Sequence, residues 1–270
     1  MHDTWYRITP AGRVAIPVTE VPDLTRQIAG ESEVPGPLLA SSRVGVAAKW
    51  TVRERDPRSG LWLPVVRRKN LFTNFGLTAL ASAIGGVYSA PLWLAINNTY
   101  TTMFAAYAAG VTTIQTNGDP TLVGDTQLVL SAGLAAQETV TFTAKNGAGP
   151  YTWTLSSATV NAHALNDPVA RAITQADTLA SFTSEQQYDS VNAPGQRMMN
   201  TAGYSTGTGN YIVQFYMSGN QATNVYFVTI GLVDSSTIGQ GNLHNAVVLG
   251  YNHTTTNDVE IDGSVTLVNN

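Results

Sequence analysis

The chain has 270 residues and no cysteine, which excludes disulfides, thiol catalysis and cysteine-ligated metals. Hydrophobic residues make up 43% of it, enough for a packed core, and charged residues only 12%, about half the usual share of roughly 25%. Eleven of the 14 Lys and Arg residues and seven of the 18 acids lie in the first 70 positions, so this part carries +4 and the remainder −8. The uneven split indicates a front segment that docks onto another surface.

Residues 1–42 contain five prolines and no sustained strand or helix period. Because proline fixes φ and removes a hydrogen-bond donor, the pattern predicts an extended N-terminal arm lying on another surface. A disordered tail is the alternative, although Trp5, Tyr6, Ile8, Val14 and Ile16 are more apolar than a solvated tail requires.

Residues 43–69 have the pattern of a β-hairpin. Apolar residues alternate from Val44 to Val52 and again from Leu61 to Val65, and Asp56-Pro57-Arg58-Ser59-Gly60 is a turn sequence between them. Cationic side chains cluster near the tip and at the base of this hairpin, and we expect them to dock onto an acidic protein surface: Arg53, Arg55, Arg58, Arg67, Arg68 and Lys69. Nucleic acid is not expected as a partner, because Glu54 and Asp56 interrupt the patch and the body is acidic.

A helix is predicted over residues 73–84. Leu77, Leu80, Ala81 and Ile84 share one helical face, and Thr73 has the position of an N-cap. We also expect Phe72 and Leu77 to form a hydrophobic staple. Glycines follow at 85–86, and residues 92–96 have the pattern of a buried strand. The uncharged run 75–96 is interrupted by glycine and proline, which argues against a membrane span.

Residues 111–171 are predicted to form a small inserted β domain. Residues 140–144 and 151–155 alternate around the turn 146–150, which indicates a second hairpin with an aromatic face. Phe142, Tyr151 and Trp153 on this face are either core residues or a platform on which a glycan stacks. Longer strand patterns return in the C-terminal third. Residues 70–110 and 172–270 are therefore expected to form a β-sandwich carrying the helix, in a mainly β protein.

No catalytic, cofactor-binding or metal-binding residues are assigned from the sequence. Gly203-Tyr204-Ser205-Thr206-Gly207 matches a nucleophile-elbow string, and Asp234 and His244 follow it, but the string lacks the strand-to-helix context that such an elbow needs. Asp258, Glu260 and Asp262 alternate along the last strand and are expected on its solvent face. The four histidines show no metal-ligand spacing and are expected in loops or at the surface.

The segment Lys69-Asn70-Leu71-Phe72-Thr73-Asn74-Phe75-Gly76-Leu77-Thr78-Ala79-Leu80-Ala81 resembles a segment that recurs in virion proteins of tailed bacteriophages. In those tail-fibre, baseplate or neck-appendage proteins an N-x-x-T-N-x-G-L-x-x-L-A helix precedes a strand similar to residues 92–96. Stretches similar to residues 184–188, an arginine such as Arg197, and strands similar to 229–232 and 259–268 follow in order. The resemblance covers about two thirds of the chain, with the insert and the front arm as departures.

The resemblance implies a structural, non-enzymatic virion component of the tail, baseplate or neck. Such a protein would form a homo-oligomer, contact other virion proteins and use no cofactor. The proposed arm and basic hairpin would then anchor it to the particle. Two alternatives remain open, a receptor-binding tail module that recognises a host surface glycan and a capsid decoration protein.

Overall fold

The computed structural model describes residues 5–9, 12–16, 44–69, 71–84, 93–201, 204–205, 210–222, 224–253 and 257–269. The chain divides into two compact units, Met1–Arg43 and Val44–Asn270. In the first unit, β1 (Trp5–Thr9) and β2 (Gly12–Ile16) pair as an antiparallel hairpin. This pairing differs from the extended arm predicted for residues 1–42, and the rest of that arm lies outside the described residues.

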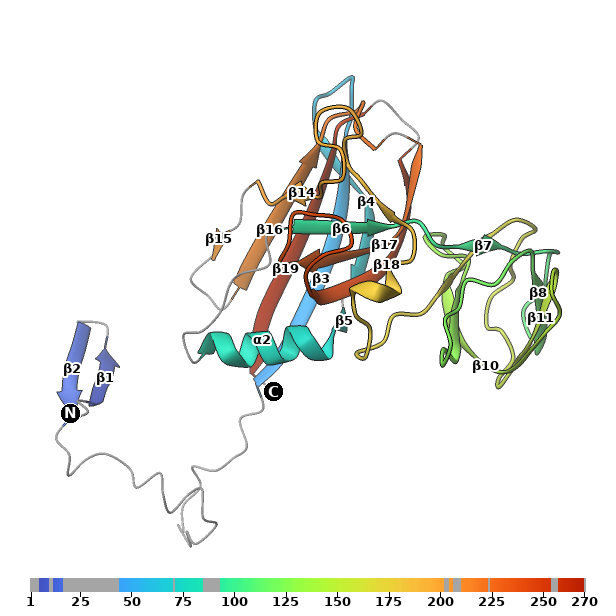
Figure 1. The fold of residues 1–270 in the computed structure, drawn as a ribbon, viewed down its shortest axis with the longest axis horizontal. Helices are drawn as coiled ribbons and strands as arrows, with labels where there is room; N and C mark the ends of the chain where they lie inside the picture. The colour runs from blue at the N-terminus through green and yellow to red at the C-terminus, as the bar shows by residue number, and fades with distance from the viewer. Residues whose placement is uncertain are drawn as a thin grey trace, which may run out of the picture. The chain divides into compact units, whose positions relative to one another are not determined.

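The second unit is mainly β, and every strand pair that the structure describes in it is antiparallel (Figure 1). Two sheets form a sandwich. The first has the order β15 (Tyr204–Ser205), β16 (Asn210–Met217), β19 (Val259–Asn269), β3 (Val44–Arg55) and β4 (Trp62–Lys69). The second has the order β13 (Glu185–Gln186), β6 (Trp93–Asn97), β17 (Val225–Val233), β18 (Leu243–His253) and β5 (Leu71–Phe72), with β14 (Met198–Met199) also on β6.

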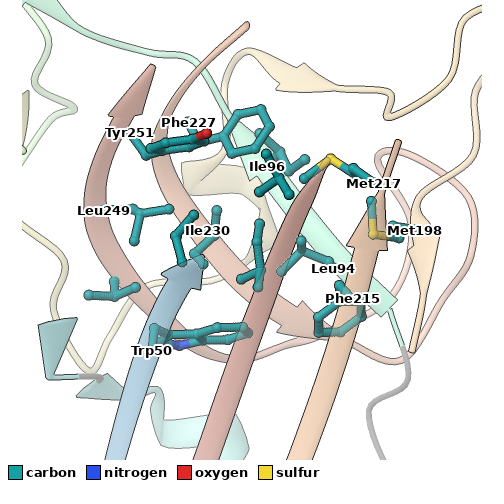
Figure 2. Packing of buried hydrophobic residues seen from close by; sticks show 14 of the residues in the cluster. Trp50, Leu94, Ile96, Met198, Phe215, Met217, Phe227, Ile230, Leu249 and Tyr251 are labelled. Atoms are coloured by element: carbon teal, nitrogen blue, oxygen red, sulfur yellow. The ribbon is translucent and has the colours of Figure 1, made fainter. Parts of the chain in front are cut away.

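The sandwich core lies between the inward faces of these two sheets, as Figure 2 shows. Trp50 on β3, Phe215 on β16 and Ile261 on β19 alternate with outward-facing residues, so the period-2 pattern of these strands matches their burial. Strands β17 and β18 are instead buried almost continuously, because their other face is also covered. This second face packs Val228 and Val248 against Val129, Ala132, Ala170 and Ala172 of a third sheet.

The third sheet is formed by residues 101–171, in the order β7 (Thr101–Thr102), β12 (Pro168–Arg171), β9 (Gln127–Leu130), β10 (Glu138–Asn146), β11 (Tyr151–Leu155) and β8 (Thr113–Thr116). A bridge between Met103 and Thr116 joins its two edges, so the sheet curls back on itself around a separate core. The sheet begins at Thr101, ten residues before the predicted boundary at 111. The sheet of 101–171 is called the inserted sheet below.

Helix α2 (Asn74–Ile84) packs against β18 and is the one α-helix among the described residues. The N-cap prediction is confirmed, because Thr73 Oγ1 accepts a hydrogen bond from the Gly76 N–H at 3.1 Å. The predicted buried face is wrong at Leu77, which is exposed, whereas Gly76 and Ala79 are buried. The side chains of Leu80, Ala81 and Ile84 lie outside the described residues, and the Phe72–Leu77 staple stays a prediction.

The helix approaches β18 through its smallest residue. A Cβ on Gly76 would lie 1.8 Å from the His244 carbonyl oxygen, so only glycine permits the contact. Across the parts of the chain that the structure describes, no helix is both long enough and apolar enough to cross a membrane.

Candidate functional site

The cationic residues predicted to dock belong to the β3–β4 hairpin, but the structure divides them into two groups. Arg53 and Arg55 face the last strand, β19, where Arg53 Nη1 lies 2.7 Å from Glu260 Oε1 and Arg55 Nη1 lies 3.6 Å from Asp258 Oδ2. Asp262 Oδ2 lies 2.6 Å from the same Arg53 nitrogen, as an ion-pair contact without the alignment of a hydrogen bond. The acidic row of β19 is therefore a partner for the hairpin rather than an unpaired solvent face.

The remaining cations of the hairpin differ in exposure. Arg68 is half-buried and donates from Nη1 to the Arg67 carbonyl at 3.0 Å, and burial lowers the pKa of its guanidinium. Arg58, Arg67 and Lys69 are exposed, Arg58 in the turn and the other two at the base. These three are the predicted docking residues that the structure leaves available for a partner.

Large apolar side chains lie between the tip and the base of the hairpin, in the turn and along β4. Leu61, Leu63 and Val65 are each about half exposed or more, and β4 is an edge strand of its sheet. Val65 is the extra residue of a β-bulge, since Val52 pairs with Val66 and Arg53 pairs with Pro64. We refer to Leu61, Leu63, Val65, Arg67 and Lys69 as the β4 strip. The bulge, Pro64 and the cations oppose strand pairing along this edge. The exposed apolar side chains therefore suit contact with another protein through side chains rather than through the backbone.

The predicted glycan platform is not present on the inserted sheet. Trp153 is fully buried, its indole N–H donates to Thr116 Oγ1 at 2.8 Å, and Phe142 packs edge-on against its ring at 4.8 Å. Lys145 Nζ lies 5.7 Å from the centre of the Trp153 ring. Trp153 is therefore core, and Phe142 and Tyr151 are partly buried against it, because alternation cannot tell which side of a curled sheet is enclosed.

The nucleophile-elbow string lacks the architecture that its chemistry needs. Tyr204 and Ser205 form the two-residue strand β15, and the next described element is strand β16 rather than a helix. His244 Nε2 does lie 3.7 Å from Asp234 Oδ2, and burial lowers the pKa of His244 although Asp234 opposes that effect. The ring of His244 also packs edge-on against Phe75, at 4.9 Å, which places it under helix α2.

A polar cluster that sequence reasoning missed lies in the inserted sheet. His163 is buried rather than at the surface, with Nδ1 2.6 Å from Ser131 Oγ and Nε2 2.7 Å from Glu138 Oε1. The Ser131 hydroxyl also lies 2.6 Å from Asp167 Oδ2. Ser131 has one proton and an ionised carboxylate can only accept, so Ser131 donates to Asp167 and His163 Nδ1–H donates to Ser131.

That proton arrangement is the reverse of the one a serine nucleophile needs, in which the imidazole accepts the hydroxyl proton. Ser131 is also fully buried. The cluster therefore joins the loop around His163 to β9 and β10 and carries no nucleophilic chemistry. His244 and His253 are also buried, on strand β18, so the expectation of a loop or surface position is wrong for these two. His163 lies in a loop, as expected, but is buried, and His2 lies outside the described residues.

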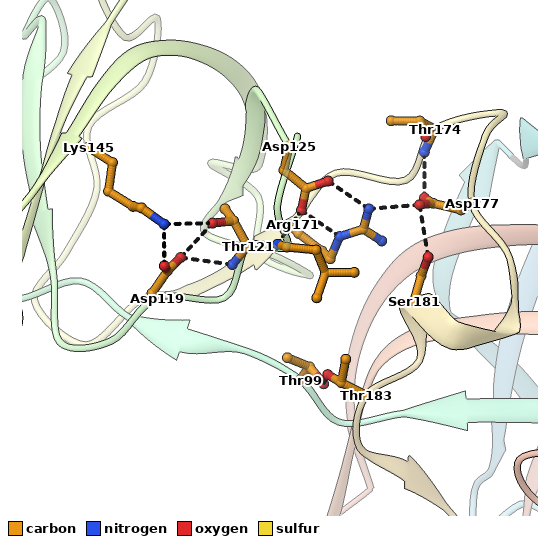
Figure 3. A network of polar contacts seen from close by, with 11 residues as sticks. Thr99, Asp119, Thr121, Asp125, Lys145, Arg171, Thr174, Asp177, Ser181 and Thr183 are labelled. Carbon is orange, nitrogen blue, oxygen red and sulfur yellow. Dashed lines mark hydrogen bonds and ion pairs between the residues drawn. The ribbon is translucent and has the colours of Figure 1, made fainter.

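Two buried arginines link segments far apart in the sequence. Arg171 at the end of β12 donates from Nε and Nη2 to both oxygens of Asp125, at 2.8 and 2.9 Å, and from Nη2 to Asp177 at 2.7 Å (Figure 3). Arg197 makes a two-fold contact with Glu185 and donates from Nη1 to the carbonyls of Ser235 and Gln240, each at 2.7 Å. Among the described residues, no group of three or more His, Asp or Glu side chains is arranged to hold a metal.

No protein-family model matches this chain, and a search of the curated proteins finds no matching relative.

Proposed function

We propose that the chain is a structural component of a tailed-phage virion that assembles as a homo-oligomer and docks through its N-terminal part. Four of the residues that carry the resemblance to phage virion proteins have architectural roles. Thr73 caps α2, Gly76 admits the helix to β18, and Glu185 and Arg197 tie two loops to the sandwich. A segment whose residues hold the fold together is what a structural protein requires.

The observation that carries the proposal is the β4 strip. Leu63 and Val65 are exposed on an edge strand and Leu61 is exposed just before it, where water contacts them and a second protein surface would bury them. Burial of apolar area contributes about 25 cal/mol per Å², so a strip of this kind favours association. Arg67 and Lys69 belong to the same strip, and their positive charge would favour an acidic partner surface. The part of this chain after residue 70 carries a net charge of −8.

Assembly is tested by changing the apolar part of the β4 strip in the full chain. We expect the double variant Leu63→Ser/Val65→Ser to lower the molar mass measured by size-exclusion chromatography with light scattering. The matched control is Leu165→Ser/Val160→Ser, which replaces an exposed leucine and an exposed valine of the inserted sheet. An unchanged mass for the first variant, or an equal loss with the control, would contradict assembly through this strip.

Docking is tested by particle incorporation. Particles produced without the chain are supplied with the Arg67→Glu/Lys69→Glu variant, with Arg58→Glu, or with a chain lacking residues 1–42. We expect the base variant and the truncated chain to lose incorporation while remaining folded, and Arg58→Glu at the turn to retain it. Incorporation of the truncated chain would show that the arm is not the anchor. Localisation of the protein on the capsid shell would favour the decoration role instead.

A further inference from the structure

A groove between the sandwich and the inserted sheet has the chemistry of a binding site. It has a volume of about 660 Å³, within the range of roughly 300–1,000 Å³ typical of small-ligand sites. None of its lining residues carries a charge, although the chain as a whole has 32 acidic and basic residues. Its polar surface comes mainly from amide and phenol side chains: Asn98, Asn166, Asn224, Asn252, Tyr100 and Tyr226.

The walls of this groove are held in place by contacts across it. The Tyr226 hydroxyl donates to the Ala132 carbonyl at 2.7 Å, and the ring of Tyr100 packs edge-on against Tyr226 at 4.9 Å. Gly133 and Gly250 meet backbone to backbone, since a Cβ on Gly133 would lie 1.7 Å from the Gly250 carbonyl oxygen. Because the groove is already formed, binding of a ligand would not carry the entropy cost of ordering its walls.

Asn98 lies at the wall of the groove. Asn98 Oδ1 is buried and has no hydrogen-bond partner among the described residues, while the Asn98 N–H donates to the Ser184 carbonyl at 3.0 Å and holds the residue in place. This oxygen has almost no accessible surface, so a ligand in the groove would meet the other atoms of the Asn98 side chain.

We infer that this groove, which we call the Asn–Tyr groove, binds a neutral saccharide. Amide side chains both donate to and accept from sugar hydroxyls, and the exposed Tyr100 ring offers an apolar face for the C–H side of a pyranose. Acidic sugars are disfavoured, because no cation lines the groove to pair with a carboxylate or sulfate. The inference does not depend on the role in a virion.

The test uses the full chain and two measurements. A glycan array carrying neutral and acidic glycans identifies the ligand class, and titration calorimetry with the strongest neutral oligosaccharide measures its affinity. We expect neutral glycans to bind, and Tyr100→Ala and Asn252→Ala, which replace exposed side chains that line the groove, each to weaken the affinity by at least about tenfold. Asn98→Ala provides an independent variant if either of these does not fold.

The matched control is Tyr216→Ala. Tyr216 is 42% exposed and Tyr100 is 43% exposed, and each packs edge-on against one aromatic partner, but Tyr216 lies outside the groove. We expect the control to keep its affinity within about twofold. Absence of binding to any neutral glycan, binding restricted to acidic glycans, or equal weakening by Tyr216→Ala would overturn the inference. A change in molar mass with Tyr100→Ala and no glycan binding would assign the groove to a subunit interface instead.

Discussion

Replacing Gly76 with alanine is the sharpest test of how helix α2 is held on the sandwich. The added Cβ would lie 1.8 Å from the His244 carbonyl oxygen, where ordinary contact begins at 3.4 Å. The neighbouring atoms are backbone on both sides, so the helix must move away from β18 by about 1.6 Å. Two hydrogen-bond donors of Thr73 lie in the path of that movement: its hydroxyl, whose single proton is shared between the Leu243 and His244 carbonyls, and its N–H, which donates to the His244 carbonyl.

The expected cost follows from these contacts. Each hydrogen bond contributes about 1 kcal/mol net, and overpacking a close contact costs about 1–3 kcal/mol. Alanine favours the helix by about 1 kcal/mol relative to glycine, which offsets part of this. We therefore expect Gly76→Ala to lower the free energy of unfolding by about 2–4 kcal/mol, equivalent to a decrease in Tm of roughly 4–16 °C for a unit of this size.

The assay is thermal and urea unfolding of the full chain followed by circular dichroism. The control is Thr78→Ala on the exposed side of the same helix, which gains helix propensity without meeting β18 and should stay within about 0.5 kcal/mol of the parent. A Gly76→Ala protein as stable as the parent would refute the close helix–strand contact.

Three further predictions concern the inserted sheet. Gly133→Ala should lower the free energy of unfolding by at least about 2 kcal/mol, because Gly133 has a φ of +84° and no room for a Cβ beside Gly250; a neutral result in urea unfolding would contradict the contact. Arg171→Met should cost about 3–5 kcal/mol by leaving two carboxylates without their partner, and unchanged unfolding would show that the network contributes nothing. Burial acts to raise the pKa values of Asp125 and Glu138, but their hydrogen bonds outweigh it and hold both below the usual range. Their stabilisation is therefore complete above the unfolded-state pKa values of about 4 and is lost as the pH falls further, so a Tm that stays constant from pH 6 to pH 2 would contradict this.

Some parts of the fold could be predicted because their signals are local. The β3–β4 hairpin combines period-2 alternation with a turn sequence, and both act within a few residues. The Thr73 cap likewise needs only the N–H of Gly76, three residues away. Periodicity misjudged the buried face of α2 because it assumes that large apolar residues point inward, whereas Gly76 and Ala79 face inward and Phe75 and Leu77 are exposed.

The sequence by itself determined the mainly β class, the helix α2 and the hairpin, since alternation, capping and turn chemistry act between neighbours. Only the tertiary structure decided which polar groups meet. Arg53 pairs with Glu260, 207 positions away in the sequence. The Asn–Tyr groove is likewise lined by residues as far apart in the sequence as Val65 and Asn252. No local pattern encodes such contacts, because they depend on strand order and on how the inserted sheet curls. The same curl encloses Trp153, which alternation alone had made a candidate for a glycan platform.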